Sequence, residues 1–416
     1  MAGRDSAQRN PLRSTSPRRS VNLGIDVPLL LTVITLIVFG LLMVYSASSD
    51  YSMMVLGEAP TFMFTRQLMW LSLGIVTAIV LTWLDYHRWQ KLAIPVMIVA
   101  ILALVGVLFV NEVINNATRT ILGGSGQPSE LGKLVIIIYL AVWLYAKRDQ
   151  LSVVSFGIVP LGAILGLMGG LIFLQPDLSA ATTIFILGGI LFFLAGGDLR
   201  QIALLLILGL VVGWMVFRFH PTGSQRVADY LVSLKDFTQA PLHLSRSLEA
   251  LVKGGWIGVG IGRADTKLTG LPVPPTDSIF AVVAEETGLF GAASVIGLYV
   301  LLMWRGLKIA QKAPDGLGKL LAAGLSLWIA VEALINMAVI VGLLPFAGNA
   351  LPFISAGGSN LVVSLAAIGI LLNISRMSAR TRENEARTLD AVVDLRWRNR
   401  RRGISRTRRT ESVHRR

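Results

Sequence analysis

The sequence predicts an all-α protein that crosses a membrane about ten times, with one large polar loop between its seventh and eighth spans. Its 416 residues are 54% hydrophobic and only 15% charged, whereas soluble domains carry about 25% charged residues. Apolar runs long enough to cross about 30 Å of hydrocarbon as helices recur along the chain. A transmembrane barrel would instead show short segments of alternating hydrophobicity, so we expect helices.

The apolar runs divide the chain into a membrane domain over residues 28–376 and two polar tails, 1–27 and 377–416. The first apolar run lacks a small-residue cleavage site, so we expect a retained helix rather than a signal peptide. The C-terminal tail is expected to be disordered. The ten spans are expected at about 28–48, 65–84, 92–110, 130–145, 153–174, 179–195, 202–217, 278–303, 320–344 and 359–374.

The distribution of charge orients these spans. The net charge is +14, and its arginines crowd the ranges 4–19 and 376–416, while further basic residues lie in alternate loops. This pattern is typical of cytoplasmic tails and loops rather than of a nucleic-acid-binding surface. We therefore expect both termini in the cytoplasm. The C-terminal tail is either solvated or in contact with anionic lipid headgroups.

The segment 218–277 is the large loop on the extracytoplasmic side. Apolar residues recur there at helical spacing in two groups, which predicts short amphipathic helices lying at the membrane interface: Val227, Leu231 and Leu234, then Leu244, Leu248 and Leu251. Arg226 belongs to a set of basic residues that oppose the topology bias. They either meet an anionic lipid-linked substrate or pair with nearby acids.

Polar residues at the ends of the spans are candidates for chemistry. Asp277 follows a proline cluster at the mouth of the eighth span, where it is either a helix cap or a functional carboxylate. Glu286 lies further along the same span, and intramembrane carboxylates are costly and usually functional. Glu130 and Lys133 are spaced to form a local ion pair, or Lys133 acts with Arg119 on a pyrophosphate.

Together these motifs resemble the SEDS family, named for shape, elongation, division and sporulation, which includes FtsW, RodA and SpoVE. The matches occur in family order over residues 28–376: Met43–Ser48, Gln127–Lys133, Gln175–Leu178, Gln225–Val227, Thr276–Phe280, Ala284–Gly288, Gly342–Pro345 and Leu351–Ser359. The long tails favour an FtsW-type protein. The chain departs from the family pattern at Thr120, Val273, Pro275, Glu332, Ala347, Ala356 and Asn360.

The resemblance implies a peptidoglycan glycosyltransferase of the bacterial inner membrane. Such an enzyme polymerises lipid II into glycan strands on the outer face and releases undecaprenyl pyrophosphate. It works with a class B penicillin-binding protein and other division or elongation proteins, and with no nucleic acid. The family's essential acidic residue corresponds to Asp277.

The chemistry expected is an inverting glycosyl transfer, for which one base is enough. Asp277 is the candidate catalytic base, or it holds a divalent cation (Mg or Mn) that assists, although no cluster of metal-ligating residues is predicted. The candidate substrate-binding residues are Arg119, Glu130, Lys133, Arg226, Glu286, Ser355 and Ser359. The alternatives are a lipid II flippase and an inactive scaffold that recruits the transpeptidase.

Overall fold

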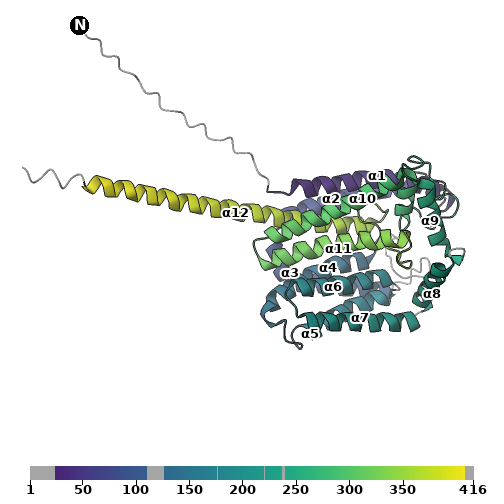
Figure 1. Ribbon diagram of the computed structural model, residues 1–416, viewed down its shortest axis with the longest axis horizontal. Coiled ribbons are helices and arrows are strands. Elements are labelled where there is room, and N and C mark those ends of the chain that lie inside the picture. Colours follow the sequence, from purple (N-terminus) through teal and green to yellow (C-terminus); the bar gives the residue numbers. More distant parts are fainter. Residues whose placement is uncertain (1–23, 110–125, 176, 220, 237–238, 408–416) are drawn as a thin grey trace, which may run out of the picture.

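The computed structural model describes residues 24–109, 126–175, 177–219, 221–236 and 239–407. Within these ranges every regular element is a helix, which confirms the predicted all-α fold (Figure 1). The elements are α1 (Val27–Met54), α2 (Phe62–Trp83), η1 (Tyr86–Arg88), α3 (Trp89–Phe109), α4 (Pro128–Lys147), η2 (Arg148–Gln150), α5 (Ile158–Phe173), α6 (Leu178–Leu194), α7 (Leu199–Phe219), α8 (Pro221–Lys235), α9 (Leu242–Gly254), α10 (Ile279–Lys312), α11 (Gly316–Ile340) and α12 (Gly358–Thr407).

Ten of these helices coincide with the ten predicted spans. Seven are long and apolar enough to cross a membrane, whereas α5, α6 and the described apolar part of α7 are shorter. The 16 residues of α5 rise only about 24 Å at 1.5 Å per residue. The protein is therefore a multi-pass membrane protein, and the count of ten spans stays a prediction.

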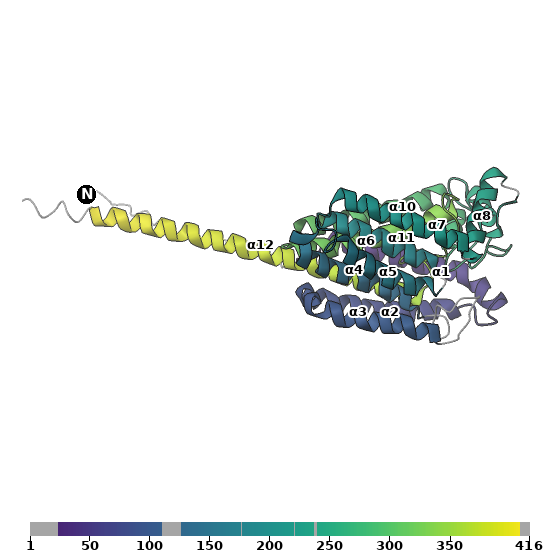
Figure 2. The ribbon, with the colours of Figure 1, turned by 90° about the horizontal axis from the view of Figure 1, so that it is seen from below.

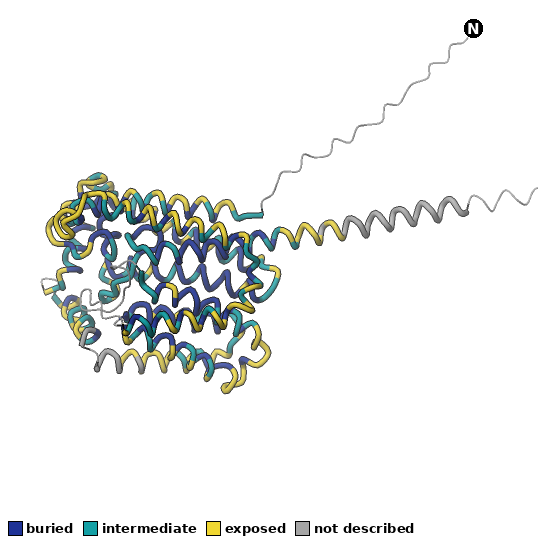
Figure 3. The backbone as a smooth tube through the Cα atoms, turned by 180° about the vertical axis from the view of Figure 1, so that it is seen from behind, coloured by how far each residue is buried: buried dark blue, intermediate teal, exposed yellow. Residues whose placement is uncertain are grey.

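The core of the bundle is formed by α4, α11 and α12. In their most apolar stretches 67%, 67% and 83% of the residues are buried, against 17% in α2. The tube in Figure 3 shows this buried centre surrounded by helices that are exposed on their outer sides. In a bilayer such exposed apolar faces lie against lipid tails, so the polar groups of the central helices are the ones shielded from lipid.

The large loop lies at one end of the bundle. It contains α8 and α9, which confirms the two predicted amphipathic helices (Figures 1 and 2). At the opposite end α12 continues beyond the bundle as a single helix to Thr407 (Figure 2). The sequence interpretation ended the last span near residue 374 and expected disorder after residue 377. The structure differs there, because residues 377–407 prolong the helix.

The eighth span, α10, is broken at Gly288, where the sequence interpretation expected an uninterrupted helix. Gly288 has φ +66°, and backbone of the loop pairs with the helix on both sides of the break. Val259 N donates to Glu285 O at 3.0 Å, and Leu289 N donates to Gly255 O at 2.9 Å. These bonds anchor the loop to α10, a short distance along the chain from Asp277.

Candidate functional site

A polar cavity of about 190 Å³ lies at the loop end of the bundle. Five chain segments that are far apart in the sequence meet around it, from the starts of α4, α6 and α12, the residues before α10, and the loop after α11. Its walls are formed by Gln127, Glu130, Lys133, Asp177, Ser179, Ala180, Thr276, Asp277, Gly348, Asn349, Ala350, Ala356, Gly357, Gly358, Ser359 and Asn360. Four of the predicted site residues, Glu130, Lys133, Asp277 and Ser359, are among them.

Asp277 is half-buried and lines this cavity. It is not the cap of α10: the N-cap is Ser278, whose side chain forms no capping hydrogen bond. Asn336 in α11 holds its backbone in place by donating from Nδ2 to Asp277 O at 3.0 Å, and to Asn349 O at 2.5 Å. The alternative that Asp277 is the N-cap of the eighth span is therefore wrong.

The backbone just before Asp277 is held by the loop that precedes α12. The Ser355 hydroxyl donates to Thr276 O at 2.7 Å, and Ala356 N donates to Pro275 O at 2.8 Å. Ser355 Oγ also accepts from Leu351 N at 2.7 Å. Ser355 thus fixes the backbone just before Asp277 and does not line the cavity. The sequence analysis had instead proposed Ser355 as a substrate-binding residue.

A buried ion triad adjoins the cavity, which two of its members, Glu130 and Lys133, line. Lys133 is only 3% exposed, and its ammonium contacts Glu130 at 3.0 Å and also pairs with Glu332 of α11, which is 1% exposed. Asn360 Nδ2 also donates to Glu130, at Oε2 and 2.9 Å. The predicted pair of Glu130 and Lys133 is confirmed. The partnership with Glu332, a residue that the sequence analysis noted only as a departure from the family pattern, is the new element.

Asp177 is a buried carboxylate of the site that sequence reasoning did not select. It caps α6, accepting from Ala180 N at 3.2 Å, and it also accepts from Gln127 Nε2 at 2.8 Å and Ser129 Oγ at 3.0 Å. These bonds tie the start of α4 to the start of α6. The signal was available, since an aspartate directly ahead of an apolar run is typical of a helix N-cap.

Ser359 lies at the rim of the cavity, at the start of α12. Its hydroxyl accepts a hydrogen bond from Gln127 N at 3.1 Å, which joins α12 to the start of α4. The starts of α12 and α4 therefore border the same cavity. Helix N-termini carry partial positive charge, so this side of the cavity suits an anion.

Glu286 does not line the cavity. It accepts from Ser46 Oγ at 2.5 Å, and Lys267 of the large loop lies 3.4 Å away. Lys267 Nζ also donates to Ser46 O at 2.9 Å. The contacts of Glu286 thus join α10 to α1 and to the loop, which is a structural arrangement distinct from the site around Asp277.

Arg226 lies beside a neighbouring apolar cavity. Its guanidinium lies 5.3 Å from the centroid of the Phe346 ring and lines a space of about 380 Å³ that shares Ser179 with the cavity of Asp277. Arg226 thus lies near the site but does not line the cavity of Asp277. Arg119, the remaining predicted contact, lies outside the described residues.

The carboxylates around the cavity do not form a metal site of the kind a resident ion needs. Within the described ranges, no three or more His, Asp or Glu side chains are grouped closely enough to hold a metal ion. Glu130 and Asp177 already accept hydrogen bonds from neighbouring side chains. These residues fit a resident Mg or Mn ion poorly, so we derive no step through one.

Comparison with known proteins identifies the family. The family model for the Cell cycle protein group FtsW/RodA/SpoVE matches residues 27–380. The chain belongs to this family. Among its relatives, a "Probable peptidoglycan glycosyltransferase FtsW" of Trichlorobacter lovleyi is 37% identical over 84% of this chain and 93% of the relative. Stage V sporulation protein E of Bacillus subtilis is 35% identical over 84% and 97% of the two chains.

Solved structures of the FtsW/RodA/SpoVE family share the fold. One is a chain of a peptidoglycan synthase complex described as coordinating polymerization and crosslinking. It has a TM-score of 0.70 and 27% identity over 85% of this chain and 98% of that one. The rod shape determining protein RodA of Thermus thermophilus has a TM-score of 0.62 and 26% identity over 85% and 97%. The family resemblance predicted from the motifs is therefore confirmed over essentially the whole membrane domain.

Proposed function

We propose that this chain is a peptidoglycan glycosyltransferase that polymerises lipid II into glycan strands and releases undecaprenyl pyrophosphate. The observation that carries the proposal is the convergence of Asp277, the triad of Lys133 and the start of α12 on one polar cavity. The curated relatives named as peptidoglycan glycosyltransferases support the same activity. We place the cavity at the outer face of the bacterial inner membrane, with both termini in the cytoplasm.

The proposed reaction inverts the anomeric centre of the donor sugar. The 4-hydroxyl of one disaccharide attacks the anomeric carbon of another, the glycosidic bond forms, and the bond to the pyrophosphate oxygen breaks with its electron pair. Asp277 accepts the proton of the attacking hydroxyl. A single base is sufficient because an inverting transfer needs no covalent sugar–enzyme intermediate. The anchored backbone around Asp277 supports this role, since the segment that carries the carboxylate is held in place before substrate arrives.

The leaving pyrophosphate requires positive charge. Lys133 lines the cavity, but Glu130 and Glu332 both contact its ammonium. We therefore assign it a positioning role through the electrostatic field of the cavity wall rather than a role as a mobile clamp. The starts of α4 and α12 line the same cavity, and helix N-termini carry partial positive charge. Arg226, on the adjoining apolar cavity, is the candidate contact for the pyrophosphate of a lipid whose chain occupies that cavity.

The size of the polar cavity bears on how substrate enters. At about 190 Å³ it is smaller than the roughly 300–1,000 Å³ typical of ligand sites. A lipid-linked disaccharide requires the cavity to join its 380 Å³ neighbour, with which it shares Ser179. We propose that movement of the large loop and of the α6–α7 region opens this connection during catalysis.

The partner we propose is a class B penicillin-binding protein, which would crosslink the strands that this chain makes. The similarity to a chain of a peptidoglycan synthase complex supports this pairing. The flippase alternative receives no comparable support. Glu285, Glu286 and Glu332 are intramembrane carboxylates that would also suit a transporter, but in the structure each accepts hydrogen bonds or ion pairs from neighbouring groups.

The test is to incubate the purified chain with lipid II in detergent, alone and with a class B partner, and to separate the products by length. Glycan polymers formed without any membrane gradient are the expected result. Translocation of lipid II in vesicles without polymer would identify a flippase. Partner binding with no polymer under either condition would identify a scaffold.

A further inference from the structure

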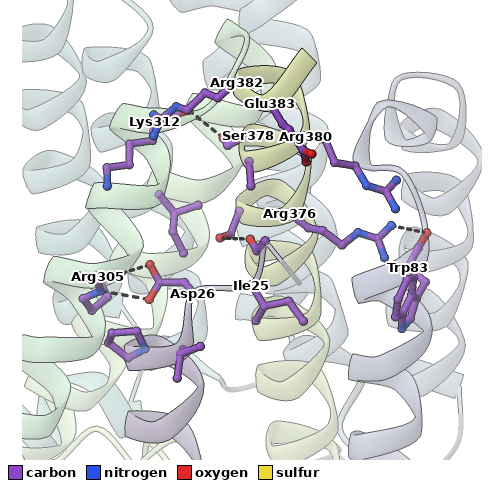
Figure 4. A pocket seen from close by; sticks show the side chains of 16 residues that line it. Ile25, Asp26, Trp83, Arg305, Lys312, Arg376, Ser378, Arg380, Arg382 and Glu383 are labelled. Atoms are coloured by element: carbon purple, nitrogen blue, oxygen red, sulfur yellow. Dashed lines mark hydrogen bonds and ion pairs between the residues drawn. The ribbon is translucent and has the colours of Figure 1, made fainter. Parts of the chain in front are cut away.

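A second polar cavity lies at the end of the bundle opposite to Asp277. Asp277 precedes the first residue of α10, whereas this cavity is lined by Lys312, the last residue of the same helix. Its volume is about 880 Å³. The segment before α1, the end of α2, the last turns of α10 and the middle of α12 surround it (Figure 4).

The lining of this cavity is strongly basic. Five cationic side chains line it against two carboxylates: Arg305, Lys312, Arg376, Arg380 and Arg382, with Asp26 and Glu383. One of the two carboxylates is fully engaged, because Arg305 donates to both oxygens of Asp26, at 3.1 and 2.6 Å. The other, Glu383, accepts from Arg387 at 2.6 Å, further along α12. Within the described part of the chain, neither of these carboxylates forms an ion pair with Lys312, Arg376, Arg380 or Arg382.

Arg376 is the feature that points to a ligand. Its side chain is buried, with 6% of the residue exposed. One guanidinium nitrogen donates to Trp83 O at 3.5 Å, and the group lies 4.2 Å from the centroid of the Trp83 ring. Its Nε and Nη1 have no hydrogen-bond partner among the residues that the structure describes. Burying unpaired donors of a cation is costly, so a guanidinium in this state calls for an anion.

The position of the cavity indicates where that anion comes from. Trp83, which is 58% exposed at the end of α2, is typical of the aromatic residues found at the boundary between hydrocarbon and headgroups. Basic pockets between helix ends on the cytoplasmic side are known to suit anionic headgroups. The chain's own N-terminal tail is a poor source of the anion, since residues 1–23 contain five arginines and one aspartate.

We propose that this cavity is a binding site for the phosphate of an anionic phospholipid headgroup. Arg376 is the buried contact and Arg380 the outer contact, and Figure 4 shows both extending from the same side of α12 toward Trp83. The planar guanidinium offers paired donors that match two phosphate oxygens. A lipid bound here joins α2 to α12 where α12 leaves the bundle. The site is remote from Asp277 and does not depend on the proposed polymerase activity.

The test measures lipid binding to the delipidated full-length chain in non-ionic detergent by native mass spectrometry. Titrations with phosphatidylglycerol, phosphatidylethanolamine and inorganic phosphate separate a lipid headgroup from free phosphate. We expect phosphatidylglycerol to bind about tenfold more tightly than phosphatidylethanolamine, and R376Q to weaken its binding about tenfold, as loss of a charge-assisted hydrogen bond does.

Two further variants make the result decisive. R380Q changes an exposed residue and is expected to weaken phosphatidylglycerol binding about threefold without affecting folding. R148Q is the matched control, because Arg148 is an exposed arginine after the end of α4 that does not line the cavity. Equal binding of the two lipids, an equal loss in R148Q, or unchanged binding in both R376Q and R380Q would overturn the proposal. Complete displacement of phosphatidylglycerol by inorganic phosphate would overturn a lipid as the source of the anion.

Discussion

Replacing Lys133 by Met tests the buried triad most severely. Met keeps much of the length of the side chain but leaves Glu130 and Glu332, which are 7% and 1% exposed, without their shared cation. Removing one partner of a buried ion pair costs about 3–5 kcal/mol. We expect a loss of that size in the free energy of unfolding, measured by titrating the purified protein in mixed micelles with a denaturing detergent.

Two companion variants separate stability from activity. K133M/E332L replaces the innermost ion pair by apolar groups and is expected to recover about half of the lost stability, because only Glu130 then lacks the cation and Asn360 still donates to it. Glycan polymerisation should stay low in both, since neither restores the charge beside the cavity. K147M, an exposed position at the other end of α4, should change stability by less than about 0.5 kcal/mol. A K133M protein as stable as K147M would refute this reasoning.

Three further predictions concern the surroundings of the site. N336L removes the donor to Asp277 O and should slow polymerisation about tenfold at saturating lipid II, with a stability loss of about 1–3 kcal/mol; an unchanged turnover rate would contradict the anchoring role. G288A should destabilise the protein by about 1–3 kcal/mol because of its φ of +66°, whereas G297A, a glycine with open space around it on the same helix, should be neutral or stabilising in the same unfolding assay. Burial lowers the pKa of His243 to about 4 from 6.5. At His243 the unfolded chain therefore binds a proton more readily than the folded chain does. The free energy of unfolding should fall as the pH drops from 6.5 toward 4, by about 2 kcal/mol at pH 5. Hydrogen exchange of α9 at pH 7.5 and pH 5 measures this, and an H243Q variant should lack the difference.

The fold was largely predictable because hydrophobic length is a strong local signal. The apolar runs locate the spans, and the spacing of Leu244, Leu248 and Leu251 located α9 within the loop. The break in α10 was not predictable in the same way. Gly288 is an ordinary glycine until the loop pairs with the backbone on both sides of it, and that pairing is a tertiary contact. The length of α12 was also missed, because charged residues after 376 were taken to end the helix.

The sequence predicted several residues of the candidate site, but few of the contacts between them. Asp277, Lys133 and Ser359 were selected and lie on one cavity. The partnership of Lys133 with Glu332 joins residues 199 positions apart, which no local pattern reveals. Glu286 was selected because a carboxylate in a membrane is costly, and in the structure Ser46 and Lys267 from other elements contact one of its oxygens. Residue type therefore indicated which groups need partners, while the fold determined which partners they find.

The most direct test of the proposed mechanism is the rate of glycan polymerisation by D277N. Asn has nearly the same shape as Asp but cannot serve as a general base, so the rate should fall by about 10²–10⁴-fold while folding and membrane insertion are retained. D265N is the matched control, since Asp265 is an exposed aspartate of the same loop that pairs with Lys253, and it should polymerise lipid II at the rate of the parent. Polymerisation by D277N at the rate of D265N would contradict the assignment of Asp277 as the base.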